Sequence, residues 1–238
     1  SKVAKKEVKV ALSGDGGDEL FCGYNRYLKG LELYKLSKNK LIKEIYKKID
    51  NNQFFLNFLN SKNRDRFEKL LSTIDSKNIE EYYKNVVEVF NSNDNLFLNQ
   101  NSLKNQFFDI QNSFDFKSEE EKLMYFDLIS YLPDDILTKV DRASMSVGLE
   151  ARAPFLDHEL VEYAFSLPIN FKKEKGSGKK IIRELLGNYL PSNLIDKSKE
   201  GFSVPIKELL SGPLNQWSKS LIEEEINSSD SLFNKLKL

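Results

Sequence analysis

Apolar side chains recur at helical spacing over most of this chain. They follow one another every three or four residues within 42–49, 82–90, 118–131 and 134–148. A repeat close to 3.6 residues places such side chains on one face of an α-helix. The pattern therefore predicts a mainly helical chain, with further helices over 157–165 and 179–189 and a last pair that begins near residues 203 and 213.

One short segment has the character of a β-strand. Residues 7–12 are β-prone and stop at a run of glycines and acids, Ser13-Gly14-Asp15-Gly16-Gly17-Asp18-Glu19. Glycine permits positive φ angles and close approach of the backbone to a ligand, and acids are favourable at the start of a helix. The sequence predicts a strand, a glycine-rich acidic loop, and a helix that continues through Leu20, Phe21, Tyr24 and Tyr27.

No second clear strand is visible, which is unusual for an α/β protein. Residues 30–116 are rich in Asn and Lys, fit a helical interpretation, and contain no repeat and no catalytic motif. We therefore expect most of the sheet to lie outside this chain.

The composition excludes several classes of protein. The 36 basic and 36 acidic residues give a net charge of zero, whereas nucleic-acid binders usually carry a basic excess. A single cysteine excludes an internal disulfide and fits a reducing compartment, and a single histidine, His158, excludes His-rich metal sites. No apolar run approaches the roughly 18 residues that span a bilayer. We expect a cytoplasmic protein that binds neither nucleic acid nor membrane.

The acidic loop has the chemistry of a metal–phosphate site. It matches neither a Walker A loop nor a calcium-binding loop. Two carboxylates at the end of a strand suit Mg²⁺ bridged to phosphate, because Mg²⁺ prefers one or two carboxylates plus phosphate oxygens. Open α/β sheets also bind ligands at strand ends. An ordinary glycine-rich turn with an acidic helix cap explains the same residues equally well.

Two further segments are rich in charge. For Glu150 and Arg152, between Tyr131 and Glu159, a network of paired charges is the preferred interpretation, and the lining of a pocket is the alternative. A lysine within 197–203 can reach a phosphate as a point charge, although most such lysines are merely solvated. Cys22 is expected to be a structural thiol, and His158 a residue at a helix start.

Three segments together resemble a known family. They are LSGDGGDELFCGYNRY, YLPDDILTKVDRASMSVGLEARAPFLDHELVEYAFSLP and KKIIRELLGNYLPSNLIDKSKEGFSVPIKELL. They closely resemble the synthetase domain of glutamine-hydrolysing asparagine synthetases, in the same order and at compatible spacing. The resemblance implies an α/β fold: the mostly helical C-terminal part of an ATP-pyrophosphatase-type (adenine nucleotide alpha hydrolase-like) parallel-sheet domain. Residues 1–238 would then be a partial synthetase domain made of 1–29 (strand, acidic loop and helix), 30–116 (variable helical region) and 117–238 (helical core).

The resemblance also implies a reaction and roles in it. ATP with Mg²⁺ adenylates the side-chain carboxylate of aspartate and releases pyrophosphate, and ammonia from a glutaminase domain of the same full-length chain then displaces AMP. By motif, Asp18 matches the carboxylate that holds Mg²⁺ and pyrophosphate, and Asp15 matches an acidic position that assists ammonia attack. Lys199 matches a lysine that contacts phosphate and stabilises charge during adenylation. The nucleotide-binding backbone is expected at Ser13, Gly14, Gly16 and Gly17.

Two features of the family are missing from the sequence: the pyrophosphate loop S-G-G-x-D-S and the N-terminal cysteine of the glutaminase. We therefore expect a C-terminal fragment of a longer enzyme, inactive on its own. Relatives of the same domain amidate polysaccharide sugars or act on peptide carboxylates, so the acceptor substrate stays open. The formation of a homodimer also stays open. A non-catalytic helical interaction module is the alternative from a different class.

Overall fold

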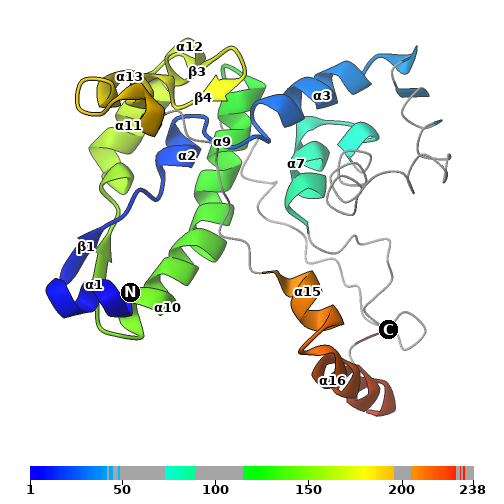
Figure 1. Cartoon of the computed structure of the whole chain (residues 1–238). Coiled ribbons are helices and arrows are strands. Elements are labelled where there is room, and N and C mark those ends of the chain that lie inside the picture. Colours follow the sequence, from blue (N-terminus) through cyan, green and yellow to red (C-terminus); the bar gives the residue numbers. More distant parts are fainter. Residues whose placement is uncertain are drawn as a thin grey trace. The chain divides into compact units, whose positions relative to one another are not determined.

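The computed structural model describes residues 1–41, 43–44, 48, 73–88, 115–195, 205–228, 231 and 233. The chain divides into two units, Ser1–Val87 with Phe114–Ile195, and Glu88–Ser113 with Asp196–Leu238. The first unit contains the acidic loop, at the end of the strand drawn in blue (Figure 1). Within the described ranges, no helix is long and apolar enough to cross a membrane.

Short helices and two small sheets make up the first unit. In chain order its described elements are α1 (Lys2–Glu7), β1 (Val10–Leu12), α2 (Gly17–Leu20), α3 (Lys29–Ser37), α7 (Ile79–Val87), α9 (Glu119–Ile129), the π-helix η3 (Leu132–Leu137), α10 (Thr138–Met145), β2 (Glu150–Arg152), the 3₁₀-helix η4 (Pro154–Leu156), α11 (His158–Ser166), α12 (Ile169–Lys172), β3 (Lys173–Glu174), β4 (Ser177–Gly178), α13 (Lys180–Leu186) and α14 (Ser192–Ile195). The second unit contributes α15 (Ile206–Ser211) and α16 (Asn215–Asn227).

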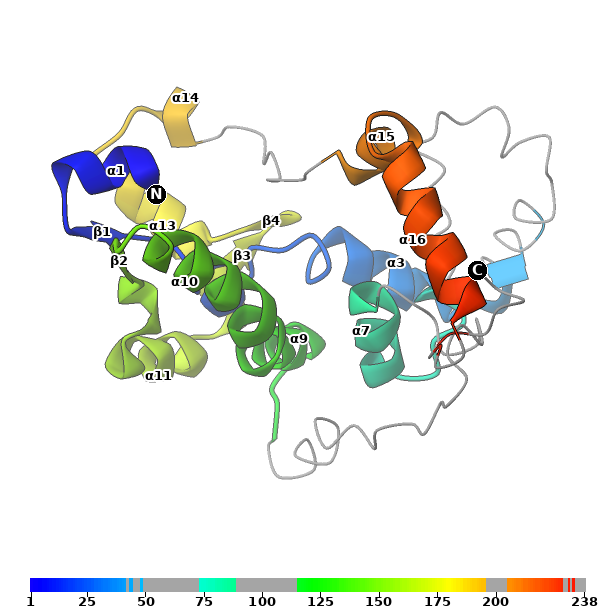
Figure 2. The ribbon, with the colours of Figure 1, turned by 90° about the horizontal axis from the view of Figure 1, so that it is seen from below.

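β1 and β2 form a parallel pair, although they are far apart in the sequence. Ala11 lies opposite Ala151, and the ladder continues past β1, where the Ser13 N–H donates to the Arg152 carbonyl (2.8 Å). Figures 1 and 2 show the two strands side by side. β3 and β4 form a separate antiparallel hairpin. The described residues thus combine helices with one parallel strand pair, and a larger parallel sheet stays a prediction.

The strand prediction was wrong in two respects. The sequence predicts one strand from Glu7, but α1 continues to Glu7 and β1 begins only at Val10. β2 was missed because its sequence, Glu-Ala-Arg, contains no β-branched or aromatic side chain. Its strand conformation comes from hydrogen bonds to β1, a long-range partner that local propensity does not reveal.

The helix predicted after the acidic loop is shorter than expected. It was to run from Asp18 through Tyr27, but α2 ends at Leu20. Cys22 adopts a left-handed φ of +57°, which an α-helix does not accommodate, and the Gly23 N–H donates to the Asp18 carbonyl (2.8 Å). The aromatic residues beyond Leu20 therefore lie in turns and not in the predicted helix.

The helix predicted over 118–131 ends before Leu132-Pro133, as expected. α9 ends at Ile129, where Ser130 leaves helical geometry (φ −131°, ψ −74°), and η3 begins at Leu132 and leads into α10. Pro133 lies in the first turn of η3, where its missing N–H costs little. The Asp134 N–H still donates to the Ser130 carbonyl at 2.9 Å, so the backbone stays bonded across the junction.

Other helix predictions are confirmed. α9 begins at Ser118, whose hydroxyl accepts a hydrogen bond from the Glu121 N–H at 3.1 Å. α11 begins at the predicted cap, where Asp157 accepts from the Glu159 N–H at 3.0 Å. Four further helices begin within three residues of where the sequence predicts them: α7, α13, α15 and α16. The stripe at Ile42, Ile45, Tyr46 and Ile49 lies outside the described residues.

A buried carboxylate, Asp127 of α9, joins three parts of the first unit. Its side chain is fully buried, and it lies 2.6 Å from the Arg26 Nε. The Tyr83 hydroxyl of α7 donates to it at 2.8 Å, and the Tyr27 hydroxyl also donates. Burial raises the pKa of Asp127, and Arg26 and the hydroxyl donors oppose that rise. Asp127 thereby fixes the segment after α2 against α9 and α7.

Aromatic rings enclose the Arg26 guanidinium. Its Cζ lies 4.1 Å from the ring centroid of Tyr24 and 4.6 Å from that of Tyr131. Cation–π contacts of this kind are strongest where water is excluded. The Tyr24 hydroxyl in turn donates to the buried Glu19 at 2.7 Å. These contacts connect the helix of the acidic loop to the α9–η3 junction.

Asp127→Ala should strongly destabilise the first unit, because it leaves the Arg26 charge and two tyrosine hydroxyls without their acceptor. Removing one partner of a buried ion pair typically costs about 3–5 kcal/mol. Asp135→Ala is the matched control, since Asp135 pairs with Lys139 (2.7 Å) at the surface and exposed pairs contribute at most about 1 kcal/mol. Urea unfolding of both variants measures the difference, and equal losses would contradict the central role of Asp127.

Candidate active site

The acidic loop follows β1 at the carboxyl end of the parallel pair, as the sequence predicts. Gly16 has a φ of +89° and faces Leu156, whose Cγ would lie 3.1 Å from a Cβ at that position. The Gly17 N–H closes the turn on the Gly14 carbonyl (3.2 Å). A side chain at Gly16 would therefore be both strained and obstructed. Gly14 differs, because nothing lies within 4 Å of the position of its Cβ.

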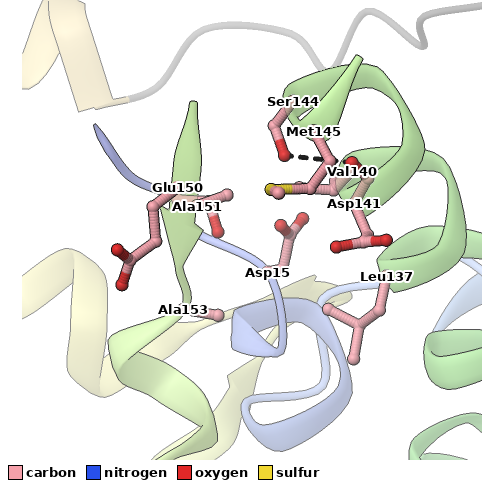
Figure 3. Close-up of a pocket in the computed structure, with 10 residues that line it drawn as sticks. Asp15, Leu137, Val140, Asp141, Ser144, Met145, Glu150, Ala151 and Ala153 are labelled. Atoms are coloured by element: carbon pink, nitrogen blue, oxygen red, sulfur yellow. Dashed lines mark hydrogen bonds between the residues drawn. The ribbon is translucent and has the colours of Figure 1, made fainter. Parts of the chain in front are cut away.

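Asp15 points into a pocket of about 210 Å³ formed by this loop, β2 and α10. Its Oδ2 atom is buried and has no hydrogen-bond partner among the described residues. Figure 3 shows the carboxylate facing the space between the strand and the helix, with Val140, Asp141 and Met145 on the helical side. Buried carboxylate oxygens normally accept a hydrogen bond. Asp15 therefore presents to the pocket a carboxylate with one acceptor oxygen unused among the described residues.

Glu150 borders the same pocket but has a different role. Its carboxylate lies 2.7 Å from the Arg152 Nε on the surface, and Figure 3 shows it directed away from Asp15. The preferred interpretation, a network of paired charges, is confirmed only as this one exposed ion pair. The alternative, that residues of this segment line a pocket, also holds for Asp141 and for Glu150 itself.

Asp18 faces a different neighbour, Lys179, at the start of α13. The Lys179 Nζ lies 2.9 Å from the Asp18 Oδ2, and about a quarter of each side chain is exposed (29% and 26%). Lys179 has a left-handed φ of +58°, and its N–H donates to the Phe21 carbonyl at 2.7 Å. The β3–β4 hairpin thus places the Lys179 ammonium beside the acidic loop.

Sequence reasoning missed Lys179. The sequence predicts a helix over 179–189 but not the hairpin before it, whose turn and second strand are formed by Gly176-Ser177-Gly178. Gly178 lies so close to Cys22 that a Cβ there would stand 2.8 Å from the Cys22 carbonyl carbon. A lysine directly after a glycine-rich segment was the available signal, but it did not reveal which acid the lysine meets.

Cys22 fits the structural role predicted for it. The thiol is fully buried, and burial raises its pKa to about 12. It therefore stays protonated at neutral pH and is a poor nucleophile. His158 is the first residue of α11, as expected.

The predicted site residues are only partly brought together. Ser13 and Asp15 line one pocket, whereas Asp18 contacts Lys179. Lys199 lies outside the described residues. In the described part of the chain, no three His, Cys, Asp or Glu side chains could hold a metal by themselves. A single carboxylate such as Asp18 suits Mg²⁺ whose other ligands are phosphate oxygens and water.

The family model described as asparagine synthase matches residues 1–238, the whole chain. The chain belongs to the asparagine synthase family. No solved structure gives a significant match to it.

Curated relatives of this asparagine synthase domain are longer proteins. Asparagine synthetase [glutamine-hydrolyzing] 1 of Bacillus subtilis is 29% identical over 231 residues, which cover 94% of this chain and 35% of that protein. The glutamine-hydrolysing asparagine synthetase of Mesocricetus auratus is 35% identical over 101 residues (40% and 17%). Amidase chyE of Penicillium rubens is 34% identical over 103 residues (40% and 15%). The chain spans about a third of the length of the Bacillus relative.

Gly23→Ala should disturb the Asp18–Lys179 contact of the asparagine synthase domain. A Cβ at this position would lie 2.7 Å from the Lys179 Cε and 2.8 Å from the Asp18 Cα. Overpacking of this kind typically costs about 1–3 kcal/mol, so the urea midpoint should fall. Gly14→Ala is the control, because its Cβ would meet open space. A Gly23→Ala variant as stable as Gly14→Ala would show that the two side chains move apart freely.

Proposed function

We propose that this chain is the synthetase part of an enzyme that makes asparagine. ATP adenylates the side-chain carboxylate of aspartate with release of pyrophosphate, and glutamine-derived ammonia displaces AMP. The observation that carries the proposal is the Asp15 carboxylate, which faces a pocket with one buried oxygen unpartnered in the described structure, in a chain that the family matches from end to end. The proposed fold is an ATP-pyrophosphatase-type domain whose parallel sheet includes β1 and β2.

Asp18 and Lys179 form the proposed phosphate side of the site. Asp18 would hold a Mg²⁺ ion, which supplies positive charge for the departing pyrophosphate when it is bound. The Lys179 ammonium, 2.9 Å from Asp18, orients that carboxylate and adds positive charge beside it. Lys199 is proposed to contact phosphate and to stabilise the charge that grows during adenylation.

The glycines of the loop divide into two groups. Open space beside Gly14 supports the proposal that the backbone at Ser13 and Gly14 approaches the nucleotide. Gly16 and Gly17 instead face Leu156 and Phe155, so their missing side chains serve packing. Any contact that they make with nucleotide would use their backbone groups.

Asp15 is the proposed base for the second half-reaction. As the ammonia nitrogen bonds to the acyl carbon and the bond to AMP breaks, a proton leaves the nitrogen for the Asp15 carboxylate. Val140, Met145 and Ala151 line the apolar part of this pocket. Asp15 can perform this task because its buried oxygen is not already engaged by a donor among the described residues.

A second candidate is an amide-forming enzyme with another acceptor carboxylate. The similarity to Amidase chyE, at 34% identity over 40% of this chain, favours an enzyme of amide chemistry over a non-catalytic module. Aspartate-dependent release of pyrophosphate separates the two candidates. The remaining proposed partners are small molecules and a glutaminase domain, in a reducing cytoplasm that suits the single cysteine.

Asp18→Asn in the enzyme with its glutaminase should abolish aspartate-dependent pyrophosphate release, because the amide lacks the charge that holds Mg²⁺. Glutamine hydrolysis should remain largely intact. Asp135→Asn is the control, since that carboxylate pairs at the surface with Lys139. Near-normal asparagine synthesis by Asp18→Asn would remove Asp18 from the mechanism.

Asp15→Asn should separate the two half-reactions. The amide keeps the shape of the side chain but accepts no proton, so ammonia-dependent asparagine formation should fall by about 10²–10⁴-fold, the usual range for a general base. ATP–pyrophosphate exchange with aspartate, which precedes ammonia attack, should change far less. Equal losses in both assays would assign Asp15 to adenylation instead.

A further inference from the structure

A second pocket of about 200 Å³ lies in the first unit, and the proposed reaction does not use it. Its polar side is the start of α9, with Lys117, Ser118 and Glu121, and Lys172 contributes from the end of α12. Its apolar side is the segment Leu167–Ile169 between α11 and α12. None of these residues lines the Asp15 pocket.

Lys172 is the unusual member of this pocket. It is only 1% exposed, yet no hydrogen bond or ion pair to its ammonium is found within the described part of the chain. Its Nζ lies 5.1 Å from the ring centroid of Phe165. The neighbouring Lys173 contrasts with it, because its Nζ meets the Glu120 carboxylate at 2.6 Å. A buried ammonium without a counter-charge is energetically unfavourable.

The charged groups that face Lys172 are one carboxylate and a second ammonium. The Glu121 carboxylate attracts the Lys172 ammonium without a direct contact, and its Oε2 accepts the Lys117 N–H at 2.7 Å. Burial lowers the pKa of Lys172, and Lys117 acts in the same direction, whereas the Glu121 carboxylate acts against it. Two ammonium groups and one carboxylate therefore surround the pocket.

Helix α9 adds to this positive field. It has 11 residues and begins beside the pocket, and the N-terminal end of a helix carries partial positive charge. The other acids of its first turn face elsewhere: Glu119 and Glu120 both approach Lys35, at 3.1 and 3.5 Å. The pocket thus has more ammonium groups than carboxylates, at a helix start and opposite an apolar wall.

We propose that this pocket binds a small organic carboxylate with a branched apolar side chain. The carboxylate accepts hydrogen bonds from the Lys172 Nζ, and the hydrocarbon part packs on Leu167, Pro168 and Ile169. The pocket volume of about 200 Å³ lies below the roughly 300–1,000 Å³ of sites for drug-sized ligands, so the ligand has few non-hydrogen atoms. The apolar wall favours an organic carboxylate over inorganic phosphate.

Isothermal titration of the full chain with isovalerate, isovaleramide and inorganic phosphate tests the ligand class. Isovalerate should bind, and the uncharged isovaleramide should not, because it offers Lys172 no negative charge. Lys172→Met should weaken isovalerate binding by about tenfold or more, as expected for loss of a charged hydrogen bond. Lys175→Met is the control, since Lys175 is exposed and close in sequence. Binding of phosphate as tight as that of isovalerate would overturn the assignment, as would unchanged binding by Lys172→Met.

Two measurements separate ligand binding from a structural role of Lys172. Without ligand, Lys172→Met should melt at the same or a higher temperature than the parent chain, because methionine removes the unneutralised charge and keeps the length of the side chain. In the unmutated chain, isovalerate should shift the methyl NMR signals of Leu167 and Ile169. Absence of those shifts would overturn the proposal even if the variant did not fold.

Discussion

The candidate site depends on the parallel pairing of β1 with β2. Hydrogen bonds join these two strands, which are far apart in the sequence. They place the acidic loop beside the start of the 3₁₀-helix η4 and beside α10. Without this pairing Asp15 would be an acid in an exposed glycine-rich turn. With it, the Asp15 carboxylate has a pocket on one side and a buried oxygen with no donor among the described residues. The same pairing explains why Gly16 must lack a side chain, since η4 packs directly against it.

Side-chain contacts from distant segments also fix the position of the acidic loop. Asp127 ties the segment after α2 to α9, and the hairpin lysine Lys179 ties α2 to α13. α2 has only four residues, too few to be stable through its own hydrogen bonds. Its position therefore depends on side chains that arrive from distant parts of the chain. Asp15 and Asp18 are thereby directed to different neighbours, which fits a division between proton transfer and phosphate binding.

Features that depend on neighbouring residues could be predicted from the sequence, whereas contacts between distant segments could not. The helix starts at Ser118 and Asp157 follow from capping residues, whose partners lie two or three positions away. β2 could not be predicted, because Glu-Ala-Arg becomes a strand only through its pairing with β1. The π-helical geometry of η3, which contains Pro133, was not predicted, because it departs from the 3.6-residue repeat of an α-helix. For the site, motif resemblance selected Asp15 and Asp18, but the role of Lys179 required the hairpin that brings it to Asp18.

Three buried carboxylates in the described part of the chain have their partners within the fold. Glu19 accepts from Tyr24, Glu120 meets Lys173, and Asp127 meets Arg26, so each of these carboxylates is satisfied within the fold. Lys172, the buried lysine of the described residues, has a ring beside it but no acceptor of its own in that part of the structure. An apolar side chain at this position would have a lower free energy in the fold. The presence of the ammonium is therefore better explained by an anion that the chain itself does not supply.

The Asp15 oxygen presents the complementary case, a buried acceptor without a donor among the described residues. Both Asp15 and Lys172 line a cavity, which is where a bound molecule would complete the hydrogen bonding.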